Sequence, residues 1–208
     1  MPVMIKPYLA ALALALAART AAAQDFDYYL LALSWTPSFC AAEGDARASR
    51  QCDPGRGLGF TLHGLWPQYE EGWPEFCDSA ARDPSRRETA AMADIMGDAG
   101  LAWYQWKKHG RCSGLSARDY FDRARLAYAL LALPEPGGSA ATAAEVEAAF
   151  LAANPDLSPE AVIVTCRGDL LREVRICLDR DLAPRPCGPD VLNDACRDRG
   201  PLDLPPPR

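Results

Sequence analysis

The chain has 208 residues, a formal net charge of −6 at pH 7 and eight cysteines. This length suits one domain of ordinary size with its own hydrophobic core. Phosphate affinity is built from clustered Lys and Arg, so the acidic balance argues against a broad, nonspecific nucleic-acid binder. It still allows an enzyme that holds a few phosphates locally.

The first 23 residues predict a secretory signal peptide. Lys6 precedes an apolar run, and the three alanines at positions 21 to 23 form an A-x-A cleavage pattern before Gln24. A membrane anchor is the alternative, but the apolar run is shorter than the roughly 18 to 20 residues that span a bilayer. We therefore expect export to the periplasm or out of the cell, with no membrane attachment after cleavage.

Two strands are predicted early in the mature chain. Residues 26–35, "FDYYLLALSW", are aromatic and aliphatic, and Pro37 ends this run. Residues 58–66, "LGFTLHGLW", form a second run that closes at Pro67. His63 is unusual in this segment, because the chain has only two histidines and a strand interior normally takes Val or Thr.

Helices are predicted next, followed by a hairpin. Helical patterns cover residues 85–96 and 101–110, and capping-box spacings begin two further helices after Ser116 and Thr142. The later segments "AVIVTC" and "LLREVRICL" are typical of two strands joined by a short turn.

These elements predict an α+β fold with a central antiparallel β-sheet flanked by helices, because strands and helices interleave without a regular βαβ rhythm. No linker is long enough to split residues 24–200, so we expect one domain. The sequence gives no sign of an oligomer interface, so we also expect a monomer. The tail, residues 201–208, is too proline-rich to join a sheet, and we expect it to be mobile.

All eight cysteines follow the predicted signal peptide, and an even number of cysteines in an exported chain predicts four disulfides. Spacing alone does not choose their connectivity. Structural zinc is the alternative, but it needs closely spaced ligand pairs and the sequence has no C-x(2–4)-C pair. We expect no metal and no cofactor.

The second histidine lies in "WYQWKKHGRC", residues 103–112. On a helix, Gln105, Lys108, His109 and Cys112 are spaced at i, i+3, i+4 and i+7 and therefore project from one face. A face that presents an amide, an ammonium and an imidazole together is unusual for a hydrophobic core.

Two imidazoles and a lysine suit the cleavage of an RNA phosphodiester. A base takes the proton of the attacking 2′-hydroxyl and an acid protonates the departing 5′-oxygen, and histidine can do either because its ordinary pKa lies near working pH. A fixed ammonium stabilises the charge that develops on the phosphate oxygens. Structural interpretations remain open for each feature taken alone: a hydrogen-bonded histidine in a strand, a solvated basic face, and tryptophans in the core.

Together, "FTLHGLWPQ" and "WKKHGRC" resemble the two active-site segments of the ribonuclease T(2) family, a family of secreted ribonucleases. The first segment matches the family pattern F-x-x-H-G-L-W-P throughout. The opening "FDYYLLALSW" and the four cysteines near the C-terminus extend the resemblance to about residues 25 to 200.

The resemblance implies a metal-independent endoribonuclease that cleaves single-stranded RNA, and not DNA, through a 2′,3′-cyclic phosphate to 3′-phosphate products with little base specificity. It implies that His109 is the general base, His63 the general acid and Lys108 the transition-state stabiliser, with Trp66 in the wall that binds a base. The implied disulfides are Cys40–Cys52, Cys77–Cys112, Cys166–Cys196 and Cys177–Cys187.

The second segment departs from the family pattern H-E-W-x-K-H-G at two positions. Tyr104 brings a hydroxyl but no cation, and Gln105 lacks a carboxylate charge, although its NH₂ group can still donate to a phosphate oxygen. Gln68 and Tyr69 are further candidates for contacting a base, or else belong to an ordinary loop. One alternative function is a catalytically weakened relative that binds RNA or another protein. The other is a disulfide-braced secreted scaffold with no nucleic-acid role.

Overall fold

A computed structural model describes residues 25–135, 138–197 and 199–208. The predicted signal peptide, residues 1–23, lies outside the described residues. Within the described ranges, no helix is both long enough and apolar enough to cross a bilayer.

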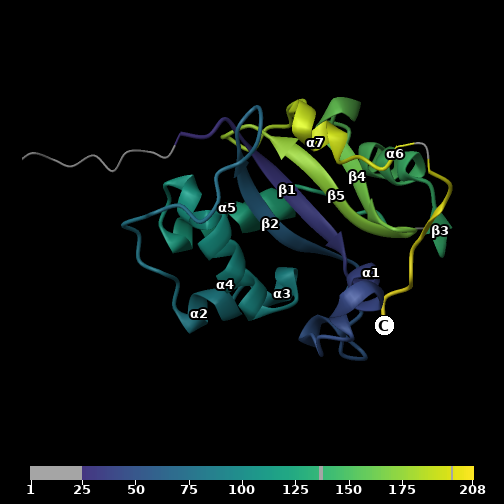
Figure 1. The fold of residues 1–208 in the computed structure, drawn as a ribbon, viewed down its shortest axis with the longest axis horizontal. Helices are drawn as coiled ribbons and strands as arrows, with labels where there is room; N and C mark the ends of the chain where they lie inside the picture. The colour runs from purple at the N-terminus through teal and green to yellow at the C-terminus, as the bar shows by residue number, and fades with distance from the viewer. Residues whose placement is uncertain (1–24, 136–137, 198) are drawn as a thin grey trace, which may run out of the picture.

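One sheet organises the fold, and the predicted α+β class is confirmed (Figure 1). The longer strands β2, β1 and β5 are antiparallel neighbours in that order, and β4 pairs antiparallel with β5 as the predicted hairpin. The strands are β1 (Tyr28–Trp35), β2 (Phe60–Gln68), β3 (Ala140–Ala141), β4 (Val162–Arg167), β5 (Leu170–Leu178) and β6 (Leu202–Asp203).

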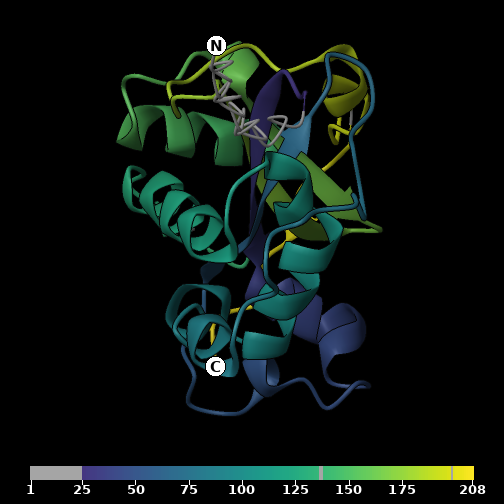
Figure 2. The ribbon, with the colours of Figure 1, turned by 90° about the vertical axis from the view of Figure 1, so that its left-hand side faces the viewer.

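The helices gather beside the sheet, with α3, α4 and α5 next to β2 and α2 packed against α4 (Figures 1 and 2). The segment predicted as one helix over residues 85–96 is divided in two, because the carbonyl oxygen of Ala91 accepts a hydrogen bond from Arg125 and not from the next helical turn. The helices are α1 (Thr36–Phe39), α2 (Arg86–Ala90), α3 (Ala93–Met96), α4 (Ala99–Lys108), α5 (Ala117–Ala129), α6 (Ala143–Ala153) and α7 (Pro189–Asn193).

Two expectations about proline are wrong. Strand β2 does not close at Pro67, which pairs with Tyr29, because β2 is an edge strand, where a residue without an N–H group is tolerated. The tail does join the sheet: Leu202 and Asp203 form β6, and the prolines of the tail lie outside these paired residues. Leu204 is also buried, so the last residues pack against the domain.

Side-chain alternation along β1 creates two faces. Tyr29, Leu31 and Leu33 pack with α5 and α6 in the larger hydrophobic cluster. Tyr28 and Leu30 point to the opposite face, where a smaller cluster includes residues of β4, β5 and α7, with Trp66 packed against it. The candidate site lies on this second face.

Four disulfides brace the fold, and they are the same four pairs that the family resemblance implies. Cys77–Cys112 ties the loop after β2 to the turn that follows α4, and α4 is the helix that ends next to His109. Of the described residues, no cysteine is free.

Candidate active site

His63 occupies a β-bulge in β2. In the β1–β2 ladder, Leu33 pairs with Leu62 and Ala32 pairs with Gly64, so His63 is the extra residue. The bulge breaks the normal alternation: Leu62 and Leu65 both enter the larger core, and the two residues between them are left for the other face. The structure therefore explains a histidine in an apolar strand, because the bulge turns it away from the core.

A buried carboxylate holds the imidazole of His63. Nδ1 of His63 lies 2.5 Å from Oε1 of Glu173 on β5, and Glu173 is only 1% exposed. Burial works against ionisation, but the hydrogen bond from His63 and the positive charges of His63 and Arg175 lower the pKa of Glu173 to about 2. The carboxylate is thus ionised, and Nε2 is the ring nitrogen of His63 left for a substrate.

Arg175 completes this buried network. Its Nε donates to Oε2 of Glu173 at 2.9 Å, and Nη1 donates to Oδ2 of Asp194 at 2.7 Å. The guanidinium also lies 5.5 Å from the centroid of the Trp66 ring. A buried carboxylate needs such a partner, since an unpaired charge in the interior costs several kcal/mol.

Trp66 lies between the two histidines. Its ring stacks on His109 with centroids 5.0 Å apart and an interplanar angle of 22°, and it meets His63 edge-on with centroids 5.2 Å apart. The indole Nε1 donates to Oε1 of Gln105 at 2.7 Å. Gly64 permits this arrangement, because an added Cβ would lie 2.3 Å from Nε1 of Trp66 and 2.5 Å from Oε1 of Gln105.

His109 stands at the C-terminal end of α4 and is 4% exposed. Its Nδ1 is buried and has no hydrogen-bond partner among the described residues. Burial, with the nearby charges of Lys108 and His63, lowers the pKa of His109 to about 3. The imidazole is therefore neutral at mildly acidic and neutral pH and can accept a proton.

Two adjacent hollows meet at His63. The first has a volume of about 560 Å³ and is lined by residues of β1, α1, β4 and β5, including Ser34, Arg167 and Glu173. The second has a volume of about 410 Å³ and is lined by Trp66, His109 and Lys108 among others.

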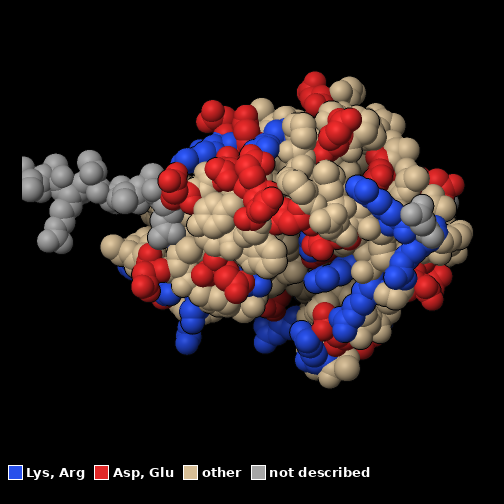
Figure 3. All heavy atoms as spheres, turned by 45° about the horizontal axis from the view of Figure 1, so that its top comes forward, with Lys and Arg blue, Asp and Glu red and all other residues tan. Residues whose placement is uncertain are grey.

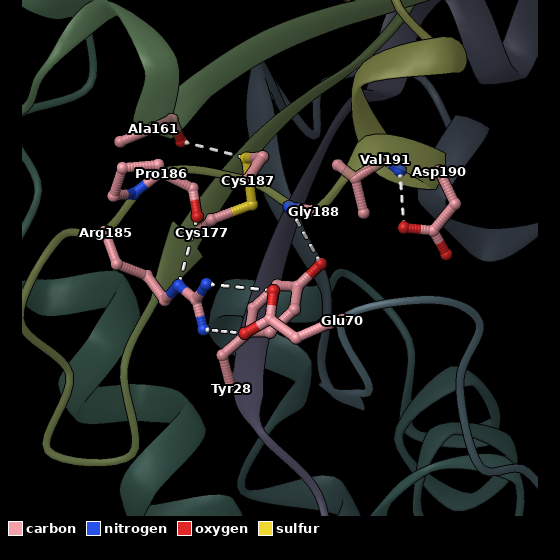
Figure 4. Close-up of a disulfide and its surroundings, with 10 residues drawn as sticks. All are labelled: Tyr28, Glu70, Ala161, Cys177, Arg185, Pro186, Cys187, Gly188, Asp190 and Val191. Carbon is pink, nitrogen blue, oxygen red and sulfur yellow. Dashed lines mark hydrogen bonds and ion pairs between the residues drawn. A yellow bond between two sulfur atoms is a disulfide. The ribbon is translucent and has the colours of Figure 1, made fainter.

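The loop after β2 and the C-terminal segment are joined beside the second hollow. Arg185 forms an ion pair with Glu70 and lies over the Tyr28 ring, close to the Cys177–Cys187 disulfide (Figure 4). The backbone N–H of Gly72 donates to Oδ2 of Asp190, which lines the hollow. Asp190 thus connects the loop after β2 to the wall of the second hollow.

The structure brings together most of the residues that the sequence singled out. The second hollow is lined by seven of these residues: His63, Trp66, Gln68, Tyr104, Gln105, Lys108 and His109. Nζ of Lys108 lies 3.3 Å from Oε2 of Glu75. Gln105 uses its carbonyl oxygen to hold Trp66, and Gln68 is buried with its amide bonded to a backbone carbonyl. Tyr69 lies apart and lines neither hollow.

Sequence reasoning missed four residues of the site. Glu173 lines the first hollow, Arg175 the second and Arg172 both, and all three stand in the strand "LLREVRICL". Three charges in an apolar strand were the signal that could have found them. Trp73 also lines the second hollow and is 52% exposed, but no pattern in its loop marks it.

Comparisons with known proteins bear on the family of the chain. The model of the ribonuclease T2 family matches residues 26–187. A ribonuclease of Aeromonas hydrophila is 45% identical over 98 residues, which cover 47% of this chain and 43% of that protein. Ribonuclease I of Escherichia coli (strain K12) is 27% identical over 232 residues, covering 88% of this chain and 86% of that protein.

The fold has counterparts among solved structures. An RNase-related protein from Calystegia sepium superposes with a TM-score of 0.66 at 23% identity, covering 88% of this chain and 99% of the other. By contrast, the chain spans about half the length of several curated relatives that it matches.

Proposed function

Because the chain belongs to the ribonuclease T2 family, we propose that it is a metal-independent endoribonuclease that cleaves single-stranded RNA. The observation that carries the proposal is the electrostatic difference between the two histidines. One is buried and neutral, and the other is held by an ionised carboxylate, and both contact the same tryptophan.

The two environments suit opposite roles in the first step. Neutral His109 takes the proton from the 2′-hydroxyl as its oxygen attacks phosphorus. His63, whose Nδ1 is hydrogen-bonded to Glu173, gives a proton from Nε2 to the 5′-oxygen as the P–O bond breaks. Lys108 stabilises the charge on the nonbridging oxygens. The products are a 2′,3′-cyclic phosphate and a free 5′-hydroxyl. Water then opens the ring to a 3′-phosphate, with the two histidines exchanging roles.

The two hollows indicate which nucleotide lies on each side of the scissile phosphate. His109 lines only the second hollow, so the nucleotide whose 2′-hydroxyl attacks lies there, beside Trp66 and the exposed ring of Trp73. His63 lines both hollows, so the leaving nucleotide lies in the first. Stacking on aromatic rings tolerates every base, and we therefore infer little base specificity. DNA lacks the attacking hydroxyl and is not cleaved by this route.

Export is part of the proposal. Four disulfides are typical of proteins that fold in an oxidising compartment. We infer that the signal peptide, residues 1–23, is removed and that the remainder acts as a monomeric single domain in the periplasm or outside the cell.

The direct test is cleavage of single-stranded RNA by the wild-type protein and by His63→Ala and His109→Ala variants. We expect either substitution to abolish most of the activity while thermal unfolding stays cooperative. The competing function is an RNA-binding or protein-binding relative without catalysis, which Tyr104 and Gln105 motivate. RNA that is bound by the wild type but stays intact from pH 4 to 8 would support that alternative.

A further inference from the structure

Of the residues that the structure describes, three line both hollows: His63, Tyr104 and Arg172. If each hollow takes one nucleotide, as the proposed function requires, then the phosphate that joins the two nucleotides lies at this boundary. The boundary residues are therefore the ones placed to touch the scissile phosphate. Arg172 has no role in the mechanism given above.

A second β-bulge directs Arg172 into the cleft. In the β4–β5 ladder, Thr165 pairs with Glu173 and the next residue, Cys166, pairs with Leu171, so Arg172 is the extra residue. Leu171 and Val174 both enter the core, which leaves Arg172 and Glu173 on the other face. Without the bulge, neighbouring residues of a strand would point to opposite faces.

This bulge resembles the β-bulge in β2 that positions His63. In Leu62-His63-Gly64-Leu65 and in Leu171-Arg172-Glu173-Val174, two residues of the larger core flank a pair that this core does not include. In both bulges, the residue that the ladder leaves unpaired lines both hollows.

Arg172 differs from the other cations of the cleft in its partners. Lys108 is paired with Glu75, and Arg175 is tied to Glu173 and Asp194. Arg172 forms no ion pair within the described part of the chain, and its side chain is exposed. Figure 3 shows basic side chains along one side of the molecular face and acidic ones gathered elsewhere, so the negative net charge is unevenly spread.

We propose that Arg172 is a catalytic residue that binds the scissile phosphate of RNA. A guanidinium presents parallel N–H donors that match two phosphate oxygens and stays charged throughout the working pH range. At the boundary it neutralises the charge that develops on the nonbridging oxygens. Tyr104, the third boundary residue, contributes a hydroxyl but no charge, so Arg172 is the permanent cation at this point.

The test uses a ribodinucleoside monophosphate, whose single phosphate is the scissile one. Arg172→Ala is compared with wild type and with Arg118→Ala. Arg118 is an exposed residue of α5 that lines neither hollow, so this control removes the same charge away from the cleft. We expect kcat/KM to fall by about 10²- to 10³-fold in Arg172→Ala, the usual effect of losing one transition-state donor, and to change less than about twofold in Arg118→Ala. Arg172→Lys should recover part of the loss.

A rescue variant separates chemistry from folding. Tyr104→His places a titratable cation at the same boundary, so adding it to Arg172→Ala should raise kcat/KM at least about tenfold below pH 6, where an ordinary imidazole is charged. The thermal midpoint should be the same in the single and double variants. A 3′-mononucleotide should also bind more weakly to Arg172→Ala than to Arg118→Ala.

The outcomes distinguish this inference from the proposed function. If wild type cleaves RNA and Arg172→Ala keeps the activity and nucleotide affinity of Arg118→Ala, Arg172 is not a phosphate ligand, although the enzyme assignment stands. Arg172→Ala could instead lose activity that neither the added Tyr104→His nor the alternative Arg172→Lys recovers, while its affinity for the nucleotide stays unchanged. The loss is then structural and the inference is wrong. A wild type that leaves RNA intact overturns both.

Discussion

His109 should make the protein less stable as the pH falls, well before the carboxylates are protonated. In the unfolded chain the imidazole titrates near its ordinary value of 6.5, whereas in the folded protein its pKa is about 3. Between these values the unfolded state binds more protons, so the free energy of unfolding decreases as the pH is lowered. At pH 4 the difference amounts to about 3 kcal/mol, since each pH unit contributes about 1.4 kcal/mol.

The assay is urea unfolding of the disulfide-intact protein at pH 7 and pH 4, with His109→Gln as the matched variant. Glutamine keeps a polar side chain of similar size but does not titrate. We expect wild type to lose about 3 kcal/mol more than the variant over this interval, measured as a larger drop in the urea midpoint. An equal loss in both proteins would show that His109 is not held neutral by burial, and the assignment of His109 as the base would lose its physical support.

Three further predictions concern the same cluster. The activity kcat/KM should fall on the acid side with a midpoint near pH 3 to 4, because this profile reports His109 of the free enzyme. The acid midpoint of kcat should lie at higher pH, because a bound phosphate anion raises the pKa of His109. Acid midpoints that coincide would contradict this. Gln105→Glu keeps an acceptor for Trp66 and adds a negative charge near His109, so the acid limb of kcat/KM should move upward, and an unmoved limb would mean that the charge at this position is passive. Gly64→Ala should lower the free energy of unfolding by about 1 to 3 kcal/mol, because its methyl group overlaps Trp66 and Gln105, and unchanged unfolding in urea would argue against that close packing.

The sequence indicated the candidate site residues better than it indicated the contacts that hold them in place. The two histidines and Lys108 could be found because imidazoles are rare in this chain and stand in unusual segments. Glu173 could not be paired with His63 by the same reasoning, since 110 residues separate them and only the order of β2, β1 and β5 brings them together.

The errors have a common origin in tertiary context. Local rules disfavour proline in strands, but they do not show that Pro67 lies on an edge strand or that the tail contributes only its non-proline residues to β6. Similarly, alternation along "LLREVRICL" predicts opposite faces for Arg172 and Glu173. The bulge that places both in the cleft is visible only in the pairing register with β4.

The central claim is that two histidines in different environments cleave RNA through its own 2′-hydroxyl. The most direct measurement incubates the purified protein in EDTA with single-stranded RNA and with single-stranded DNA of the same sequence, and follows the products over time. The account predicts cleavage of RNA alone, with a 2′,3′-cyclic phosphate that appears first and is then converted to a 3′-phosphate. Cleavage of both nucleic acids, or RNA products that carry 5′-phosphates, would contradict it.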